Sequence, residues 1–460
     1  MKARQSSAIV LDSDRIAWLL FQLSLPAFLG MLAMALDNVV GTIFVGRYVG
    51  PRGIAALSLI FPVQMLAMGV GQITGIGGSS LISRLLGAGQ IGTAKRVLGN
   101  SIAFTFLLSI TMMVSGLGLL DFWLRLMGAS DDVLPHAREY LRIILFGIGF
   151  QIFGMALSGL IRAEGNARVP MIGMMVGALL NILLSGYFVG MVKMGVKGAA
   201  LATLFSQLIS FLYLASFYRG KKTVFRLGLR DFRLSLSVLR PVFAIGFASF
   251  AMTLANSVSG VLVNHVLGTY GGDYAISAFG IINRIVMFAM MPSMVIGQGV
   301  QPIIGFNYGA RRFDRAIRAI NMAISAATLL SISIFFVLYS APDTFIGVFT
   351  SDEDLLNLAS EATRTMFLGL YFMGFVMVGS IVFQALGRAR QSLVTSLSRP
   401  VFFFIPLVLI LPYFFQLKGV WLAFPVSDFL TFLLILSFLI PEINRLRRAA
   451  REHQSPSEAR

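Results

Sequence analysis

The residue with the clearest chemical potential in this sequence is Asp37, which lies within the apolar stretch Met34–Gly41. A carboxylate inside a hydrocarbon layer costs about 2.5–3.5 kcal/mol, so its retention there needs a reason. Such a group could hold and release a proton, bind a cation such as Na⁺, or contact a cationic substrate. The alternative is a structural carboxylate that is satisfied by Asn38 or by a neighbouring helix.

Other polar residues of the first half could surround Asp37. Pro26 precedes Asp37 by about three helical turns and removes a backbone hydrogen bond, so it predicts either a movable bend or a static kink. Small polar residues in two later apolar segments could line a cavity with Asp37, or could join helices by hydrogen bonds. They are Asn181, Ser185, Thr203, Ser206 and Gln207.

The second half has its own polar residues within apolar segments. Arg284 and Asp428 could pair with each other, which would neutralise both charges, or could line a path for a charged substrate. Gln298 and Gln301 lie one helical turn apart and are further candidates for the substrate path, as is Asn38. Arg399, before Pro400, is predicted to be an interfacial anchor.

Catalytic and metal-binding patterns are missing from the sequence. The chain has no Cys and three isolated His residues, His136, His265 and His453. The glycine-rich stretch Gly71–Gly78 lacks the Gly-Lys-Ser/Thr ending of a phosphate-binding loop. We therefore predict that the protein is not an enzyme and has no cofactor, and that any energy source is an ion gradient or a partner.

Composition indicates an integral membrane protein. The 460 residues are 57% hydrophobic and 12% charged, whereas soluble domains carry about 25% charge. We predict an all-α fold with twelve membrane-spanning helices. The predicted spans are residues 16–45, 54–82, 97–119, 139–161, 170–190, 198–218, 241–266, 274–303, 319–340, 362–386, 394–415 and 420–441.

The net charge of +17 comes largely from basic residues in the loops between the predicted spans. Most of the 37 Lys and Arg residues fall in loops on one side of these spans, which the positive-inside rule places in the cytoplasm together with both termini. This distribution favours a membrane origin of the positive charge over nucleic-acid binding. The basic segment 219–240 is predicted to be a solvated linker, with contact to anionic headgroups as the alternative.

An internal duplication relates the two halves. Residues 121–168 align with 343–390 at an offset of 222, which pairs Glu139 with Glu361 and Gly165 with Gly387. An offset of 218 pairs Gly50 with Gly268 and Asp37 with Ala255, so the carboxylate occurs in one half only. Six spans per copy predict two lobes of the same orientation, related by a pseudo-two-fold axis along the membrane normal. The predicted parts are residues 1–220, the linker 221–240, the second lobe 241–441 and a basic cytoplasmic tail 442–460.

Several stretches resemble the MATE family of multidrug exporters, of the DinF/MepA-like kind. The resemblance covers essentially the whole chain. The matching stretches are Pro26 with Asp37-Asn38, Gly87–Gly89, Arg162–Pro170, Gly198–Thr203, Gln298–Ala310 and Gly419–Asp428.

The resemblance implies export of cationic or amphipathic compounds in exchange for H⁺ or Na⁺. It also implies an ion site formed by Asp37, Asn181 and Thr203, in a lobe that rocks against the other. Many members have an Asp where this chain has Ser185, and some have an acid within a segment that here is residues 242–263 and contains none. These departures favour H⁺ over Na⁺.

Other functions remain open at this stage. A major-facilitator transporter is disfavoured because the loop 84–96 has no acidic residue, and a lipid or polysaccharide-precursor flippase is disfavoured by the few cations within spans. A membrane scaffold would not need Asp37 in one half only. We expect a monomer in the inner membrane of a prokaryote, with small molecules and lipid as its partners and no nucleic acid.

Overall fold

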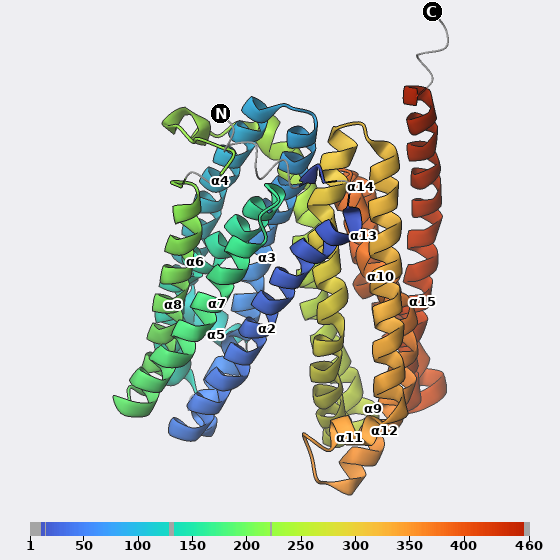
Figure 1. Ribbon diagram of the computed structural model, residues 1–460. Helices are drawn as coiled ribbons and strands as arrows, with labels where there is room; N and C mark the ends of the chain where they lie inside the picture. The colour runs from blue at the N-terminus through green and yellow to red at the C-terminus, as the bar shows by residue number, and fades with distance from the viewer. Residues whose placement is uncertain (1–10, 14, 128–132, 221–222, 455–460) are drawn as a thin grey trace, which may run out of the picture. The chain divides into compact units, whose positions relative to one another are not determined.

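The computed structural model describes residues 11–13, 15–127, 133–220 and 223–454, and these residues form helices joined by turns (Figure 1). The predicted N-terminal residues 1–10 and the end of the predicted tail, 455–460, lie outside the described residues. The all-α prediction is confirmed.

Ten helical segments of the described chain are long and apolar enough to span a membrane. Two of them are interrupted by a residue outside the helical region, Gly272 with φ 63° in α9 and Gln416 with φ 53° in α15. Dividing these two segments at their breaks yields the twelve predicted spans. The helices extend beyond the predicted apolar windows because their terminal turns carry polar and charged residues.

The first half contains six long helices and two short elements. They are α2 (Ile16–Tyr48), α3 (Pro51–Gly87), α4 (Ile91–Gly118), the short α5 (Leu120–Leu126), α6 (Leu134–Ala163), α7 (Arg168–Ser185), the π-helix η2 (Gly186–Met191) and α8 (Gly195–Phe217). Helices α6, α7 and α8 lie side by side, with α8 packed against both of its neighbours (Figure 1).

The second half follows a short 3₁₀ helix, η3 (Leu229–Phe232). Two of its spans are built from shorter pieces joined by 3₁₀ or π-helical turns. Its elements are α9 (Leu236–Gly309), α10 (Phe313–Ser340), α11 (Pro342–Ile346), α12 (Glu353–Met366), the 3₁₀ helix η4 (Phe367–Gly369), α13 (Leu370–Ala385), α14 (Ala389–Leu397), the π-helix η5 (Ser398–Phe404) and α15 (Ile405–Gln454). The first residues of the predicted tail, 442–454, therefore form the end of α15.

Contacts divide the chain into two compact units. The first contains Met1–Asp14 and Phe21–Phe250, and the second contains Arg15–Leu20 and Ala251–Arg460. The first unit therefore includes the basic linker and the beginning of α9.

The linker is docked on α4 of the first unit. The carboxylate of Asp231 pairs with Lys95 at 2.9 Å. Asn100 donates to the backbone carbonyl of Asp231 at 3.1 Å and accepts from the backbone N–H of Ser235 at 2.7 Å. Any side chain at Gly99 would meet the Asp231 carbonyl, because a Cβ there would lie 2.3 Å from that oxygen. The linker is therefore docked on α4 through Asp231 and Ser235, while its basic side chains in the described residues remain exposed, as a solvated charge requires.

Glycines bring α3 and α6 together. A Cβ on Gly159 would lie 2.5 Å from the carbonyl oxygen of Gly75, and a Cβ on Gly71 would lie 2.9 Å from the carbonyl oxygen of Ile152. Small residues let two membrane helices approach until their backbones touch, which increases dispersion contacts between them. These close contacts fix α3 and α6 relative to each other within the first unit.

The duplication is visible in the geometry of both units. Lys197 pairs with Glu139 at 2.7 Å, and their sequence counterparts Lys418 and Glu361 pair at 3.0 Å. The turns between helices also recur, since Gly165 and Gly387 both have positive φ, at 84° and 76°.

One part of the predicted alignment changes. The counterpart of Gly50, with φ 85°, is Gly272 with φ 63°, at the offset of 222. Gly268, the predicted counterpart, lies inside α9 with helical backbone. A match of residue type alone does not fix the alignment at a turn, whereas the need for positive φ identifies the residue at which the chain turns.

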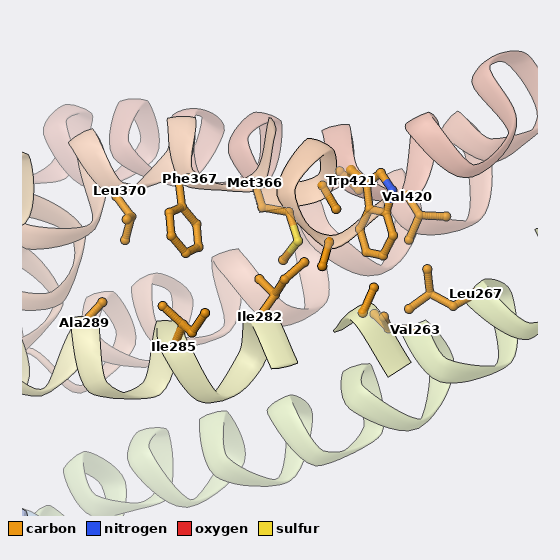
Figure 2. Close-up of a cluster of buried hydrophobic side chains, with 14 of the residues drawn as sticks. Val263, Leu267, Ile282, Ile285, Ala289, Met366, Phe367, Leu370, Val420 and Trp421 are labelled. Atoms are coloured by element: carbon orange, nitrogen blue, oxygen red, sulfur yellow. The ribbon is translucent and has the colours of Figure 1, made fainter. Parts of the chain in front are cut away.

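The core of the second unit forms where α9, the α12–η4–α13 segment and α15 meet (Figure 2). Phe367 and Leu370 point toward Ile285 and Ala289 of α9 in this view (Figure 2). Trp421 is 3% exposed and belongs to the same cluster. This packing holds the irregular η4 segment against α9.

Candidate functional site

Packing of α2 against α7 positions Asp37. Helix α2 runs continuously through Pro26. A Cβ on Gly30 would lie 2.9 Å from the sulfur of Met174, so the glycine allows close contact with α7. Asp37 and Asn181 each follow this contact by seven residues, which is about two turns on both helices. The same crossing therefore brings the two polar side chains together.

The carboxylate of Asp37 is hydrogen-bonded to the neighbouring helix. Asn181 Nδ2 donates to Asp37 Oδ1 at 2.8 Å. Thr203 Oγ1 lies 3.5 Å from Asn181 Oδ1 and 3.0 Å from the carbonyl oxygen of Ala199. The structure thus brings together the three residues that the family resemblance implied. Asn38 is exposed, so its side chain does not replace Asn181 as the partner of Asp37.

Two further residues extend this cluster, and sequence reasoning missed both. The buried hydroxyl of Tyr140 on α6 makes hydrogen bonds with Thr203 and with Gln64 on α3, and it lies close enough to Asp37 for an electrostatic interaction. The available signal was weak, since a Gln and a Tyr in apolar segments are common. The polar cluster thereby links α2, α3, α6, α7 and α8.

Asp37 has no cationic partner among the residues that the structure describes. Its amide partner presents the NH₂ group, and the Asn181 carbonyl oxygen instead faces Thr203. The half-buried carboxylate therefore requires a proton, a bound cation or a cationic ligand for neutrality.

The remaining polar residues of this half are not hydrogen-bonded to Asp37. Ser185 is 4% exposed and lies one turn beyond Asn181, at the end of α7. Ser206 Oγ donates to the backbone carbonyl of Thr203 at 2.9 Å, which is a local helix contact. Gln207 Oε1 lies close to Gly147, at 3.3 Å from the position of a Cβ there.

The predicted pairing of Arg284 with Asp428 is wrong. Arg399 donates its Nε–H to Asp428 Oδ1, and the Asp428 side chain is 4% exposed. Arg284 lies on an exposed face of α9. Arg399 is therefore no interfacial anchor, because the π-helical η5 directs its side chain to a buried carboxylate. Asp428 is neutralised, and Asp37 is not.

The two glutamines of α9 are packed in the second unit. Gln301 is 7% exposed, and its Nε2 is a buried donor without a hydrogen-bond partner among the described residues. Gln298 is partly buried. The adjacent Gly297 packs against Ile381 of α13, which places this polar pair at a close helix contact.

A second buried carboxylate lies outside the spans, and the sequence did not predict it. Glu164 is fully buried after α6 and accepts hydrogen bonds at Oε2 from Thr223 Oγ1 and from the Val224 N–H, both at 2.9 Å. Burial raises the pKa of Glu164 to about 7, although these two bonds and Tyr218 oppose the shift. This carboxylate therefore fixes the start of the linker to the first unit.

Comparison with known proteins decides the family. The family model described as MatE matches residues 26–188 and 245–410, one match in each half and together most of the chain. The chain belongs to the MatE family. The resemblance read from the motifs is thereby confirmed.

Curated relatives of this MatE protein carry a functional name. It is 28% identical over 400 residues to the multidrug export protein MepA of Staphylococcus saprophyticus, covering 86% of this chain and 87% of the relative. It is also 28% identical over 421 residues to MepA of Staphylococcus haemolyticus, covering 90% and 92%.

Solved MATE structures share the fold. A multidrug resistance MATE family transporter of the MOP superfamily, in an outward-facing conformation, matches with a TM-score of 0.90 at 27% identity, over 96% of this chain and 99% of that one. A MOP superfamily transporter from Pyrococcus furiosus matches with a TM-score of 0.90 at 28% identity, over 97% and 99%. Twelve spans in two lobes are the architecture of these neighbours.

Proposed function

We propose that this protein is a multidrug exporter that couples efflux of cationic or amphipathic compounds to H⁺ entry. Multidrug export is the named function of its MepA relatives. The observation that carries the coupling proposal is Asp37, a half-buried carboxylate with an amide partner and no cation among the described residues.

The choice of H⁺ over Na⁺ rests on the groups that face the carboxylate. A buried Na⁺ would need several oxygen ligands, but Asn181 offers its NH₂ group to Asp37. Ser185 supplies no second carboxylate. No group of three or more His, Asp or Glu residues that could hold a metal occurs in the described part of the chain. One carboxylate is sufficient to carry one proton, so H⁺ is the simpler coupling ion.

The mechanism follows from charge neutralisation. Substrate binds from the cytoplasm or the inner leaflet, and the unit that contains Asp37 rocks to the outward-facing state. A proton from outside removes the charge of Asp37, weakens its bond to Asn181 and allows α2 to change shape at Pro26. A cationic substrate then loses its electrostatic attraction and leaves. Release of the proton to the cytoplasm restores the starting state.

The placement of the protein is part of the same proposal. We infer the inner membrane of a prokaryote, with both termini in the cytoplasm, because the basic loops fall on one side of the predicted spans. The partners are small molecules and lipid, with no nucleic acid and no cofactor. The protein acts as a monomer in this scheme.

The test is dye transport by the purified protein in vesicles. Ethidium accumulation is measured with an acidic lumen, and separately with an outward Na⁺ gradient at equal pH. The variants are Asp37→Asn and, as a matched control, Asp121→Asn, which removes an exposed carboxylate paired with Arg138. We expect transport driven by the pH gradient in wild type and the control, and its loss in Asp37→Asn. Transport that requires Na⁺, or full activity of Asp37→Asn at equal incorporation, would refute the coupling proposal.

A further inference from the structure

A cavity of about 100 Å³ lies inside the second unit, separate from the Asp37 cluster. Its wall is largely aromatic and thioether, from residues that include Phe279, Met290, Phe367, Met373 and Phe424. An apolar cavity of about 150 Å³ can hold one benzene ring, so a ring would enter this smaller space only when the flexible Met side chains move outward. Its polar lining consists of Asn283, Arg399 and Asp428.

Two irregular helical turns line the cavity, one with a polar and one with an apolar side chain. Arg399 lies on the π-helix η5, and Phe367 lies on the 3₁₀ helix η4. Pro400 contributes to the wide turn of η5 because it has no backbone N–H, and its carbonyl oxygen accepts a hydrogen bond from Ser259 at 3.2 Å. Such turns within longer helices are frequent at functional sites. Here they direct Arg399 inward.

Asp428 is closed off from any ligand on one side. A Cβ on Gly369 would lie 2.2 Å from Asp428 Oδ2, so the backbone of η4 is packed directly against this oxygen. The other oxygen, Oδ1, accepts from Arg399. The carboxylate therefore orients and neutralises the guanidinium and has little surface left for a cation.

Arg399 is the member of the pair that faces the cavity. Its side chain is 29% exposed, against 4% for Asp428. The hydrogen bond to Asp428 uses Nε, and the structure records no other hydrogen bond of this guanidinium among the described residues. The terminal NH₂ groups remain available, in a planar arrangement that matches a carboxylate.

The internal duplication supports a role in ligand binding. At the offset of 221 that aligns Lys197 with Lys418, Phe424 corresponds to Thr203 and Asp428 to Gln207. Thr203 lies in the Asp37 cluster of the first unit, and its counterpart Phe424 lies in the wall of the cavity of the second unit. The second unit therefore has a related location with different chemistry. It has an aromatic wall and the accessible NH₂ groups of an Arg that is paired with Asp428, in place of an uncompensated carboxylate.

We propose that this cavity is a subsite for substrates that carry an aromatic carboxylate, with Arg399 binding the carboxylate and the Phe and Met wall holding the ring. Asp428 is the positioning residue. The proposal rests on the proposed export function, and it names the residues of the second unit that would hold the carboxylate of a zwitterionic substrate. The carboxylate end binds in the second unit.

The first test is equilibrium binding to the purified full chain by fluorescence anisotropy. The probes are tetramethylrhodamine, which carries a free benzoate group, and its methyl ester, which has the same ring system without the negative charge. We expect about tenfold tighter binding of the free acid, the effect of one charge-assisted hydrogen bond. We also expect benzoate to displace the free acid and benzyl alcohol not to displace it. Equal binding of both dyes, or equal displacement by both competitors, would overturn the proposal.

Variants then assign the effect to the cavity. The double variant Arg399→Gln/Asp428→Asn removes both charges and leaves no buried ion unpaired, and it should reduce the acid-to-ester affinity ratio to about one. The control Lys418→Gln removes a cation of the same unit whose side chain is 76% exposed, and it should retain the wild-type ratio. An unchanged ratio in the double variant would overturn the assignment to Arg399. Ion-driven transport of the methyl ester by wild type reports separately on the export function, so failure of one proposal is distinguishable from failure of the other.

Discussion

Stability of the docked linker should depend on pH through Glu164. The carboxylate has a pKa of about 7 in the folded protein, against an ordinary value of 4.5. Between these values the folded protein holds a proton that the unfolded chain has released. Stability therefore falls as pH rises from about 4.5 to about 7, and it changes no further above that. The difference in pKa corresponds to about 3 kcal/mol, at 1.36 kcal/mol per pKa unit.

The variant Glu164→Gln keeps the shape of the protonated side chain and cannot ionise. Its amide oxygen can still accept from Thr223 and Val224. We expect the stability of this variant not to fall as pH rises. The variant should be about as stable as wild type at pH 5 and about 3 kcal/mol more stable at pH 8. The measurement is thermal unfolding in detergent, followed by tryptophan fluorescence from pH 5 to pH 8.

A local measurement links the effect to the linker. Trypsin cleavage after Arg226 and Arg230, both beyond the contact with Glu164, should be faster in wild type than in the variant at pH 8. The control Glu139→Gln removes a carboxylate that is exposed and paired with Lys197. If Glu164→Gln loses stability with pH as steeply as wild type and this control, the assigned role of Glu164 is refuted.

Two further predictions concern the helices that form the first unit. Gly159→Ala should destabilise the protein by about 1–3 kcal/mol, because its Cβ would overlap the Gly75 carbonyl, whereas Gly154→Ala on the same helix meets no atom within 4 Å and should be neutral or slightly stabilising. Thermal unfolding of both variants measures this, and equal midpoints would contradict the close packing. Asn181→Ala removes the hydrogen bond to Asp37, and ion-driven dye transport should fall by at least about tenfold at equal incorporation. Retained transport would show that Asn181 is dispensable.

Much of the architecture could be predicted from local sequence. Apolar windows of span length require helices in a bilayer, since no other open structure satisfies the backbone there. The repeated residues, such as Glu139 with Glu361 and Gly165 with Gly387, indicated two related halves. The docking of the linker was not predicted, because no local signal reveals the partners that Asn100 and Lys95 provide.

The site was predicted less completely. Asp37 was identifiable because a carboxylate in an apolar span is rare, and Asn181 and Thr203 followed from the family resemblance. Tyr140 and Gln64 were not identified, since neither is unusual in an apolar segment. The pairing of Asp428 was predicted wrongly, because Arg284 and Arg399 are equivalent choices until the π-helical turn of η5 directs one of them inward.

The sequence by itself therefore determined the number of spans, the duplication and the isolated charge at Asp37, because each depends on residue type and spacing along the chain. Only the tertiary structure decided which charge is neutralised and which is not. A buried charge is balanced by whichever side chain the helix crossings bring within hydrogen-bonding distance. Those crossings depend on close glycine contacts, such as Gly30 with α7 and Gly369 with Asp428, between segments far apart in the sequence.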